Sequence, residues 1–144
     1  MIETIKELEA KLAQAKAEEA KMTGFDVVIF EGEELVEIKA KAHELSEQDK
    51  ATIMRAAGTL GDNMESIQRV AKQLDNKVGA WLEMLALIDV PLKSIISIVF
   101  GIEAEKVASL PNIELLGLVF EENQWINTNA KNLAKELEYI AKKQ

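Results

Sequence analysis

The residues best placed for chemistry are few, and the first group is acidic. Glu31, Glu33 and Glu34 surround Gly32 and could bind a divalent cation or act as paired carboxylates. A Ca²⁺-binding loop needs Asp or Asn at alternating positions and a closing Glu, and this segment lacks that pattern. We therefore interpret these glutamates as a solvated turn.

The other candidates for catalysis stand alone. His43 is the single histidine of the chain, and no Ser or Cys lies in a nucleophile motif that it could serve as a base. Gly58 and Gly61 lack the GK[ST] ending of a phosphate-binding loop and mark the end of a helix instead. The chain has no cysteine, which excludes disulfides, thiolate zinc sites and cysteine nucleophiles. We expect no enzyme, no cofactor and no metal.

Composition favours a protein as the partner. The 144 residues carry 17 Lys and Arg against 25 Asp and Glu, a net charge of −8. The basic residues are scattered, so nothing offsets repulsion from phosphate backbones or anionic membranes. No stretch approaches the roughly 20 apolar residues that a membrane span needs. The first residues form a polar helix pattern and not a signal peptide, so we expect a cytoplasmic protein.

The N-terminal segment has a narrow apolar seam. Ile5, Leu8, Leu12 and Ala15 are spaced 3, 4 and 3 apart, which predicts an amphipathic helix over residues 2–22. One narrow stripe buries little, so this helix either packs on the body or pairs with another chain. We divide the protein into this helix, residues 1–22, and a helical globular domain, residues 25–144.

A β-hairpin is predicted near residues 25–42. Residues 25–30, FDVVIF, are β-branched and aromatic, and Val36, Ile38 and Ala40 then alternate with charged residues. The alternative is a helix over residues 33–45, because Glu, Lys and Ala favour helix over strand.

Two helical patterns follow. Ser46 and Asp49 form a capping signal for a helix to about Thr59. Beyond it, apolar residues are spaced alternately 3 and 4 apart, which indicates a heptad seam with a break or kink near residues 75–77. This seam comprises Met64, Ile67, Ala71, Leu74, Val78, Trp81, Leu85 and Ile88. Spacing alone leaves open whether the seam is intramolecular or pairs two chains.

Prolines and a glycine divide the next stretch into short apolar helices. Pro91 should stop the preceding helix and begin one that ends at Gly101. A further short helix is expected over residues 103–110, and another begins at Pro111. The last helix should start between residues 124 and 127 and run to Lys143. The sequence thus predicts a mainly α fold, a compact multi-helix bundle with one hairpin.

The tryptophans differ in setting. Trp81 lies in phase with the apolar seam and is expected in the core. Trp125 follows the polar run of residues 121–124 at a helix junction, where it either anchors a partner or packs the last helix onto the body.

The stretch over residues 85–127 resembles the tail assembly chaperones of long-tailed bacteriophages. It has an apolar helix ending in Phe-Gly, ISIVFGI (residues 96–102), then EAEKVASLPNIELLGLVFEENQ (residues 103–124). The resemblance implies a protein without catalysis that coats the helical tape-measure protein, recruits tail tube subunits and self-associates. The alternative is a small oligomeric adaptor or inhibitor acting through helix pairing. The candidate partner-binding residues are Leu8, Leu12, Phe120, Trp125 and Ile126.

Overall fold

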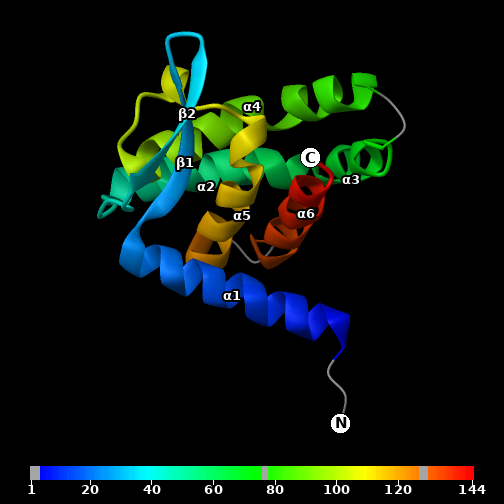
Figure 1. Cartoon of the computed structure of the whole chain (residues 1–144), viewed down its shortest axis with the longest axis horizontal. Coiled ribbons are helices and arrows are strands. Elements are labelled where there is room, and N and C mark those ends of the chain that lie inside the picture. The colour runs from blue at the N-terminus through cyan, green and yellow to red at the C-terminus, as the bar shows by residue number, and fades with distance from the viewer. Residues whose placement is uncertain (1–3, 76–77, 127–129) are drawn as a thin grey trace.

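The computed structural model describes residues 4–75, 78–126 and 130–144 (Figure 1). Over these residues the chain forms six α-helices and one two-stranded hairpin, which confirms the mainly α prediction. The elements are α1 (Ile5–Thr23), β1 (Phe25–Glu31), β2 (Glu34–Ala40), α2 (Glu47–Asp62), α3 (Met64–Ala71), α4 (Val78–Phe100), α5 (Ile113–Glu122) and α6 (Ala130–Lys142). Short 3₁₀ turns, η1 (Ala104–Lys106), η2 (Leu110–Asn112) and η3 (Gln124–Ile126), join the later helices.

The hairpin is confirmed where it was predicted. β1 and β2 pair antiparallel from Phe25 opposite Ala40 to Glu31 opposite Glu34. Gly32 has φ +65° at the tip, a conformation that side-chain-bearing residues avoid. The helical alternative for residues 33–45 is wrong, because pairing with β1 and half-burial of one face outweigh the helix preference of Glu, Lys and Ala.

The loop after α4 pairs with the edge of β1 that does not face β2. Val107 pairs with Ile29 as an isolated bridge, and the Ala108 N–H donates to the Val28 carbonyl at 3.2 Å. The expected helix over residues 103–110 is therefore wrong: the segment consists of η1, extended backbone at Val107 and the start of η2. Val107 is fully buried, so pairing with β1 fixes an extended conformation that β-branched residues favour.

Helix α4 continues through Pro91, contrary to the predicted stop. An internal proline costs about 3 kcal/mol through a lost hydrogen bond and a steric clash. Here burial compensates, because Ile88, Leu92 and Ile95 around the proline are fully buried. Each such side chain contributes about 1.5–3 kcal/mol, which exceeds the proline penalty in sum.

The heptad seam does not form one continuous surface. α3 ends at Ala71 and α4 begins at Val78, and the two helices pack against each other. Ile67 and Ile88 are buried, but Val78 is almost fully exposed. The break was predicted near residues 75–77, and residues 76–77 lie outside the described residues. The spacing rule assumes one continuous helix, so it does not apply across α3 and α4, which are separate helices packed on each other.

The core lies among α2 to α6 and includes Phe25 and Val27 of β1 and Val107 beside it, whereas α1 lies outside it (Figure 1). The capping box of α2 is confirmed, with Ser46 Oγ accepting from the Asp49 N–H at 3.1 Å. The apolar residues of α6 pack within the chain, because Leu133, Leu137 and Ile140 are buried. Among the described residues, no helix is long and apolar enough to cross a bilayer.

Candidate protein-binding site

The predicted partner-binding residues separate into exposed and buried sets. Leu8 and Leu12 on α1 are 53% and 57% exposed, and Trp125 is 41% exposed. Phe120 and Ile126 lie in the core at 0% and 1% exposure, so they are corrected to packing residues. The sequence placed them wrongly because a helix with apolar residues on most sides does not reveal which side faces solvent.

Trp125 is held by its neighbours. Its Nε1–H donates to Asn123 Oδ1 at 3.1 Å, and Lys50 Nζ lies 5.7 Å from the ring centroid. The ring therefore covers the junction of η3 with α2 and already has a cation on its face. This arrangement favours the packing interpretation of Trp125 over the anchor interpretation.

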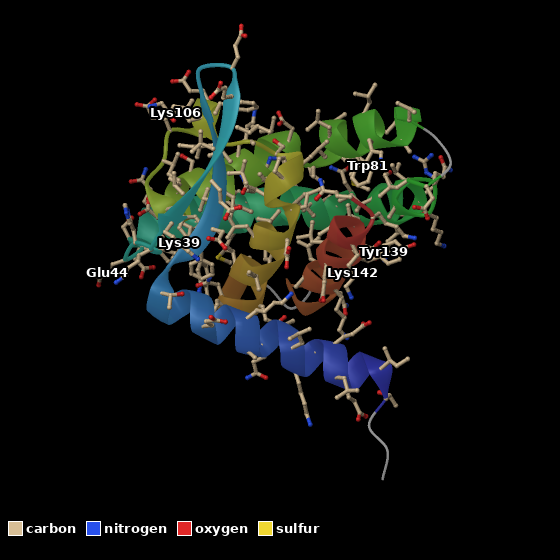
Figure 2. All side chains as sticks on the ribbon, viewed as in Figure 1. Lys39, Glu44, Trp81, Lys106, Tyr139 and Lys142 are labelled. Carbon is tan, nitrogen blue, oxygen red and sulfur yellow. The ribbon has the colours of Figure 1, made fainter. Side chains whose placement is uncertain are left out.

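The other sequence candidates have structural positions. Glu31, Glu33 and Glu34 form the exposed hairpin tip, as the turn interpretation predicted. His43 is exposed and lies against Gly101, which ends α4 with φ +66°. Gly58 and Gly61 lie in the last turns of α2, not in a loop. Trp81 packs on the core from α4 (Figure 2).

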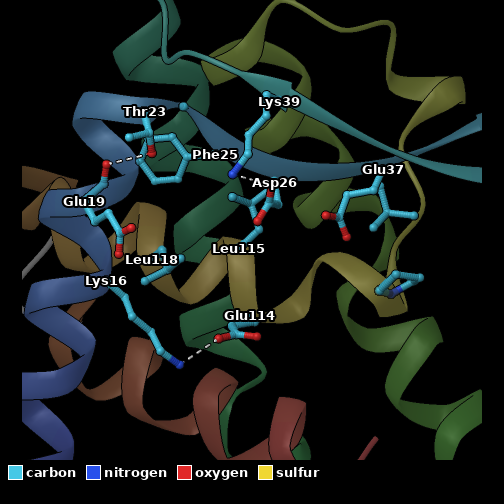
Figure 3. Close-up of a pocket in the computed structure, with 13 residues that line it drawn as sticks. Lys16, Glu19, Thr23, Phe25, Asp26, Glu37, Lys39, Glu114, Leu115 and Leu118 are labelled. Carbon is cyan, nitrogen blue, oxygen red and sulfur yellow. Dashed lines mark hydrogen bonds and ion pairs between the residues drawn. The ribbon is translucent and has the colours of Figure 1, made fainter.

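A cavity of about 400 Å³ opens between the C-terminal half of α1, the base of the hairpin and the start of α5 (Figure 3). Lys39 Nζ contacts Asp26 Oδ1 at 2.7 Å across the two strands. That hydrogen bond is the main reason why the pKa of Lys39 is raised, and nearby Glu37 and Glu19 add to the effect. Lys16 reaches from α1 to Glu114 on α5 at 3.6 Å.

A second cavity, of about 610 Å³, continues along α1 towards its N-terminal end, between α1 and the α5–α6 pair. Both cavities are lined by Lys16, Glu114 and Leu118, so they form one continuous depression. Figure 2 shows Tyr139 and Lys142 on α6, and these two residues line its far end. We name this depression, with the residues that line the two cavities, the α1 trough.

The trough has an apolar interior. Leu12 and Ala13 line it from α1, and the half-buried Leu118 lines it from α5. Leu115 and Ala134 reach the facing wall as well, but each is only 5% exposed.

Helix α1 is attached to the body by weak contacts. None of its residues that can be described is buried. The ion pairs that join it to the later helices include Lys16 with Glu114 and Lys142 with Glu9, each at 3.6 Å between half-exposed side chains. Exposed pairs of this kind contribute about 0–1 kcal/mol each. The apolar seam of Ile5, Leu8 and Leu12 thus remains open to a partner.

The sequence identified only the α1 side of this site. Leu118, Ala134 and Tyr139 were missed, because a trough between helices distant in sequence has no signature in either helix alone. The one available signal concerned Leu118, because the apolar residues of 113–120 are more than one buried face requires.

The described lining of the trough combines apolar side chains with Lys and Glu residues that pair across it. Among the described residues, no group of three or more His, Cys, Asp and Glu side chains could hold a metal ion. Compared with known proteins, the chain matches no family model, and no curated protein or solved structure is significantly similar to it.

Proposed function

We propose that this chain is a non-enzymatic protein-binding protein that holds a helical segment of its partner in the α1 trough. The observation that carries the proposal is the apolar seam of α1, where Ile5, Leu8 and Leu12 are 74%, 53% and 57% exposed. Leu12 lines the trough itself, and Leu8 and Ile5 continue the seam towards the N-terminal end of α1. A seam of this spacing would be costly to leave in water on a monomer with no partner.

The shape of the trough supports a helix as the bound element. An amphipathic helix binds a groove through residues at positions i, i+3, i+4 and i+7, with its polar side left in solvent. The α1 seam has a similar spacing, and the half-buried Leu118 supplies apolar surface from α5. Because α1 contacts α5 directly and Lys16 reaches Glu114, a partner helix would lie along the open side of the trough, over Leu12 and Leu118.

The finer proposal is an assembly chaperone of the kind that serves long-tailed bacteriophages. Residues 85–127 carry the resemblance, and the partner would be the long helical tape-measure protein or the tail tube protein. Binding a helix in an exposed apolar trough suits that role, because it shields the partner from aggregation before assembly. The expected location is the cytoplasm of the host cell.

The test is co-expression with the product of a long coiled-coil reading frame directly downstream of the gene. We expect one complex on size-exclusion chromatography, and we expect Leu8→Glu with Leu12→Glu to abolish it. Met54→Glu is the matched control, since Met54 is also about half exposed but lies on α2. The absence of such a reading frame would contradict the finer proposal. A complex indifferent to Leu8→Glu with Leu12→Glu would contradict the trough.

The second candidate function is an oligomeric adaptor, and a ridge on α4 favours it. Leu82 and Val90 are 68% and 74% exposed, and Ala86 between them is exposed as well. Residues four apart form one ridge, and two such ridges pack at about −50°. The ridge has a large, a small and a large side chain in order, Leu82, Ala86 and Val90. The same ridge on a second copy that runs antiparallel is therefore complementary to it, with Ala86 opposite Ala86.

Sedimentation across a concentration series tests this candidate. We expect wild type to dimerise through α4, so Ala86→Glu should give a monomer whereas Leu8→Glu should not. A monomer for wild type at every concentration would rule the adaptor out. A dimer lost only with Leu8→Glu would move the interface to α1.

A further inference from the structure

We propose that the helix bound in the α1 trough carries Lys or Arg residues beside its apolar stripe. This inference rests on the proposed function and names the chemistry of the partner. It follows from the charge of the trough, the way that charge is paired, and the cations that already reach across it.

Carboxylates outnumber ammonium groups along the trough. Among the described residues, its lining includes eight carboxylates and four lysines, an excess of four negative charges. This excess has the same sign as the net charge of the whole chain, which is −8. The carboxylates are Glu7, Glu9, Glu19, Asp26, Glu37, Glu114, Glu121 and Glu138, and the lysines are Lys16, Lys39, Lys135 and Lys142.

Several of these carboxylates form no ion pair of their own, although Glu19 and Glu37 lie near enough to Lys39 to help raise its pKa. Lys39 pairs with Asp26, Lys16 with Glu114, and Lys142 lies 3.6 Å from both Glu9 and Glu138. Within the described part of the chain, by contrast, no ion pair involves Glu19, Glu37 or Glu121. The excess acid is thus distributed along the trough, with Glu19 and Glu37 in the cavity of Figure 3 and Glu121 in the other.

The protein's own lysines show that a cation fits between the walls. Lys16 projects from α1 and meets Glu114 on α5, as Figure 3 shows. Lys142 projects from α6 and meets Glu9 on α1. A lysine on a bound helix could form a similar ion pair with a carboxylate of the trough. Its ammonium group would stay in solvent while its aliphatic stem covers apolar surface.

The apolar wall and the acidic residues together select one class of helix. Leu12, Ala13 and Leu118 favour an apolar stripe, and the carboxylates beside them favour flanking cations. A helix with acidic flanks is repelled by the same field, and a neutral one gains only the apolar contact. An anionic membrane surface is repelled as well, so a basic amphipathic protein helix is the occupant that these observations favour.

Three labelled peptides of about 18 residues test the inference by fluorescence anisotropy with the full chain. All share one Leu stripe, and their polar positions are Lys, Gln or Glu. We expect the Lys peptide to bind about tenfold more tightly than the Gln peptide, and the Glu peptide not to bind. Raising the salt concentration should remove most of the difference.

Two matched triple variants locate the effect. Glu19→Gln, Glu37→Gln and Glu121→Gln together should weaken Lys-peptide binding about tenfold and leave Gln-peptide binding unchanged. The control removes three exposed carboxylates outside the trough with the same change in net charge, through Glu65→Gln, Glu83→Gln and Glu105→Gln. Equal weakening by both triples would overturn the inference, because attraction would then come from overall charge.

The remaining outcomes separate this inference from the proposed function. Equal binding of the Lys and Gln peptides, abolished by Leu12→Glu, would overturn the charge preference and support the trough as a helix-binding site. Failure of all three peptides to bind would contradict both the preference and the helix-binding function.

Discussion

Asn112 is the residue on which the position of the hairpin depends most, and its replacement gives the sharpest stability prediction. The side chain is fully buried. Its Oδ1 accepts from the Val28 N–H at 2.9 Å, and its Nδ2 donates to the carbonyls of Val28 at 2.7 Å and Ala108 at 2.6 Å. At the edge of β1 that does not pair with β2, the Asn112 amide therefore makes hydrogen bonds of the kind that a neighbouring strand would make.

The expected loss follows from which groups Asn112→Ala would leave unpaired. The Val28 carbonyl keeps the Ala108 N–H at 3.2 Å, but the Val28 N–H and the Ala108 carbonyl lose the hydrogen bonds to Asn112. Each unsatisfied buried group costs about 1–3 kcal/mol, so we expect the free energy of unfolding to fall by about 3 kcal/mol. Asn112→Asp should lose at least as much at neutral pH, because its second oxygen faces two carbonyls.

Urea unfolding followed by far-UV circular dichroism measures both variants. The control is Asn132→Ala on the exposed face of α6, where we expect a change within about 0.5 kcal/mol. The Asn112→Asp defect should shrink as the pH falls and the carboxyl group gains a proton to donate. A change below about 0.5 kcal/mol for Asn112→Ala would refute the claim that this amide anchors the hairpin.

Three further predictions concern stability. Gly101→Ala should lower the free energy of unfolding by about 1–2 kcal/mol in urea unfolding, because φ at this position is +66°. Adding His43→Ala should restore little of that loss, because the exposed His43 ring can already move away from the new Cβ. Phe25→Ala should cost about 3–5 kcal/mol in the same assay, and Phe30→Ala much less, because Phe25 is 5% exposed and Phe30 39%; equal losses would contradict this placement of β1. Burial, only partly offset by Lys72, raises the pKa of Glu136, so the folded state binds its proton more tightly than the unfolded chain and ionisation above that pKa costs stability. Glu136→Gln should therefore stabilise the protein at pH 7, with a gain that disappears in thermal unfolding as the pH falls through the folded pKa; a constant gain would contradict burial as the cause.

Local patterns predicted the elements that local chemistry determines. The alternation of Val36, Ile38 and Ala40 identified β2 although its residues favour helix, because only one face of the strand is half-buried. Ser46 and Asp49 predicted the start of α2, since a capping box lies wholly within one turn.

The failures have one physical cause, which is that long-range packing outweighed a local signal. Pro91 stays within α4 because apolar side chains on both sides of it are buried against other helices. Val107 is extended because β1 offers it a partner many residues away. The α1 trough belongs to this class as well, since it exists only where α1 meets α5 and α6.

The most direct test of helix binding in the α1 trough is nuclear magnetic resonance of the ¹⁵N-labelled full chain, titrated with the Leu/Lys peptide. The account predicts that amide shifts concentrate on α1 around Leu8 and Leu12 and on the facing surfaces of α5 and α6 around Leu118 and Tyr139. Shifts confined to α3 and α4, or no shifts at millimolar peptide, would contradict it.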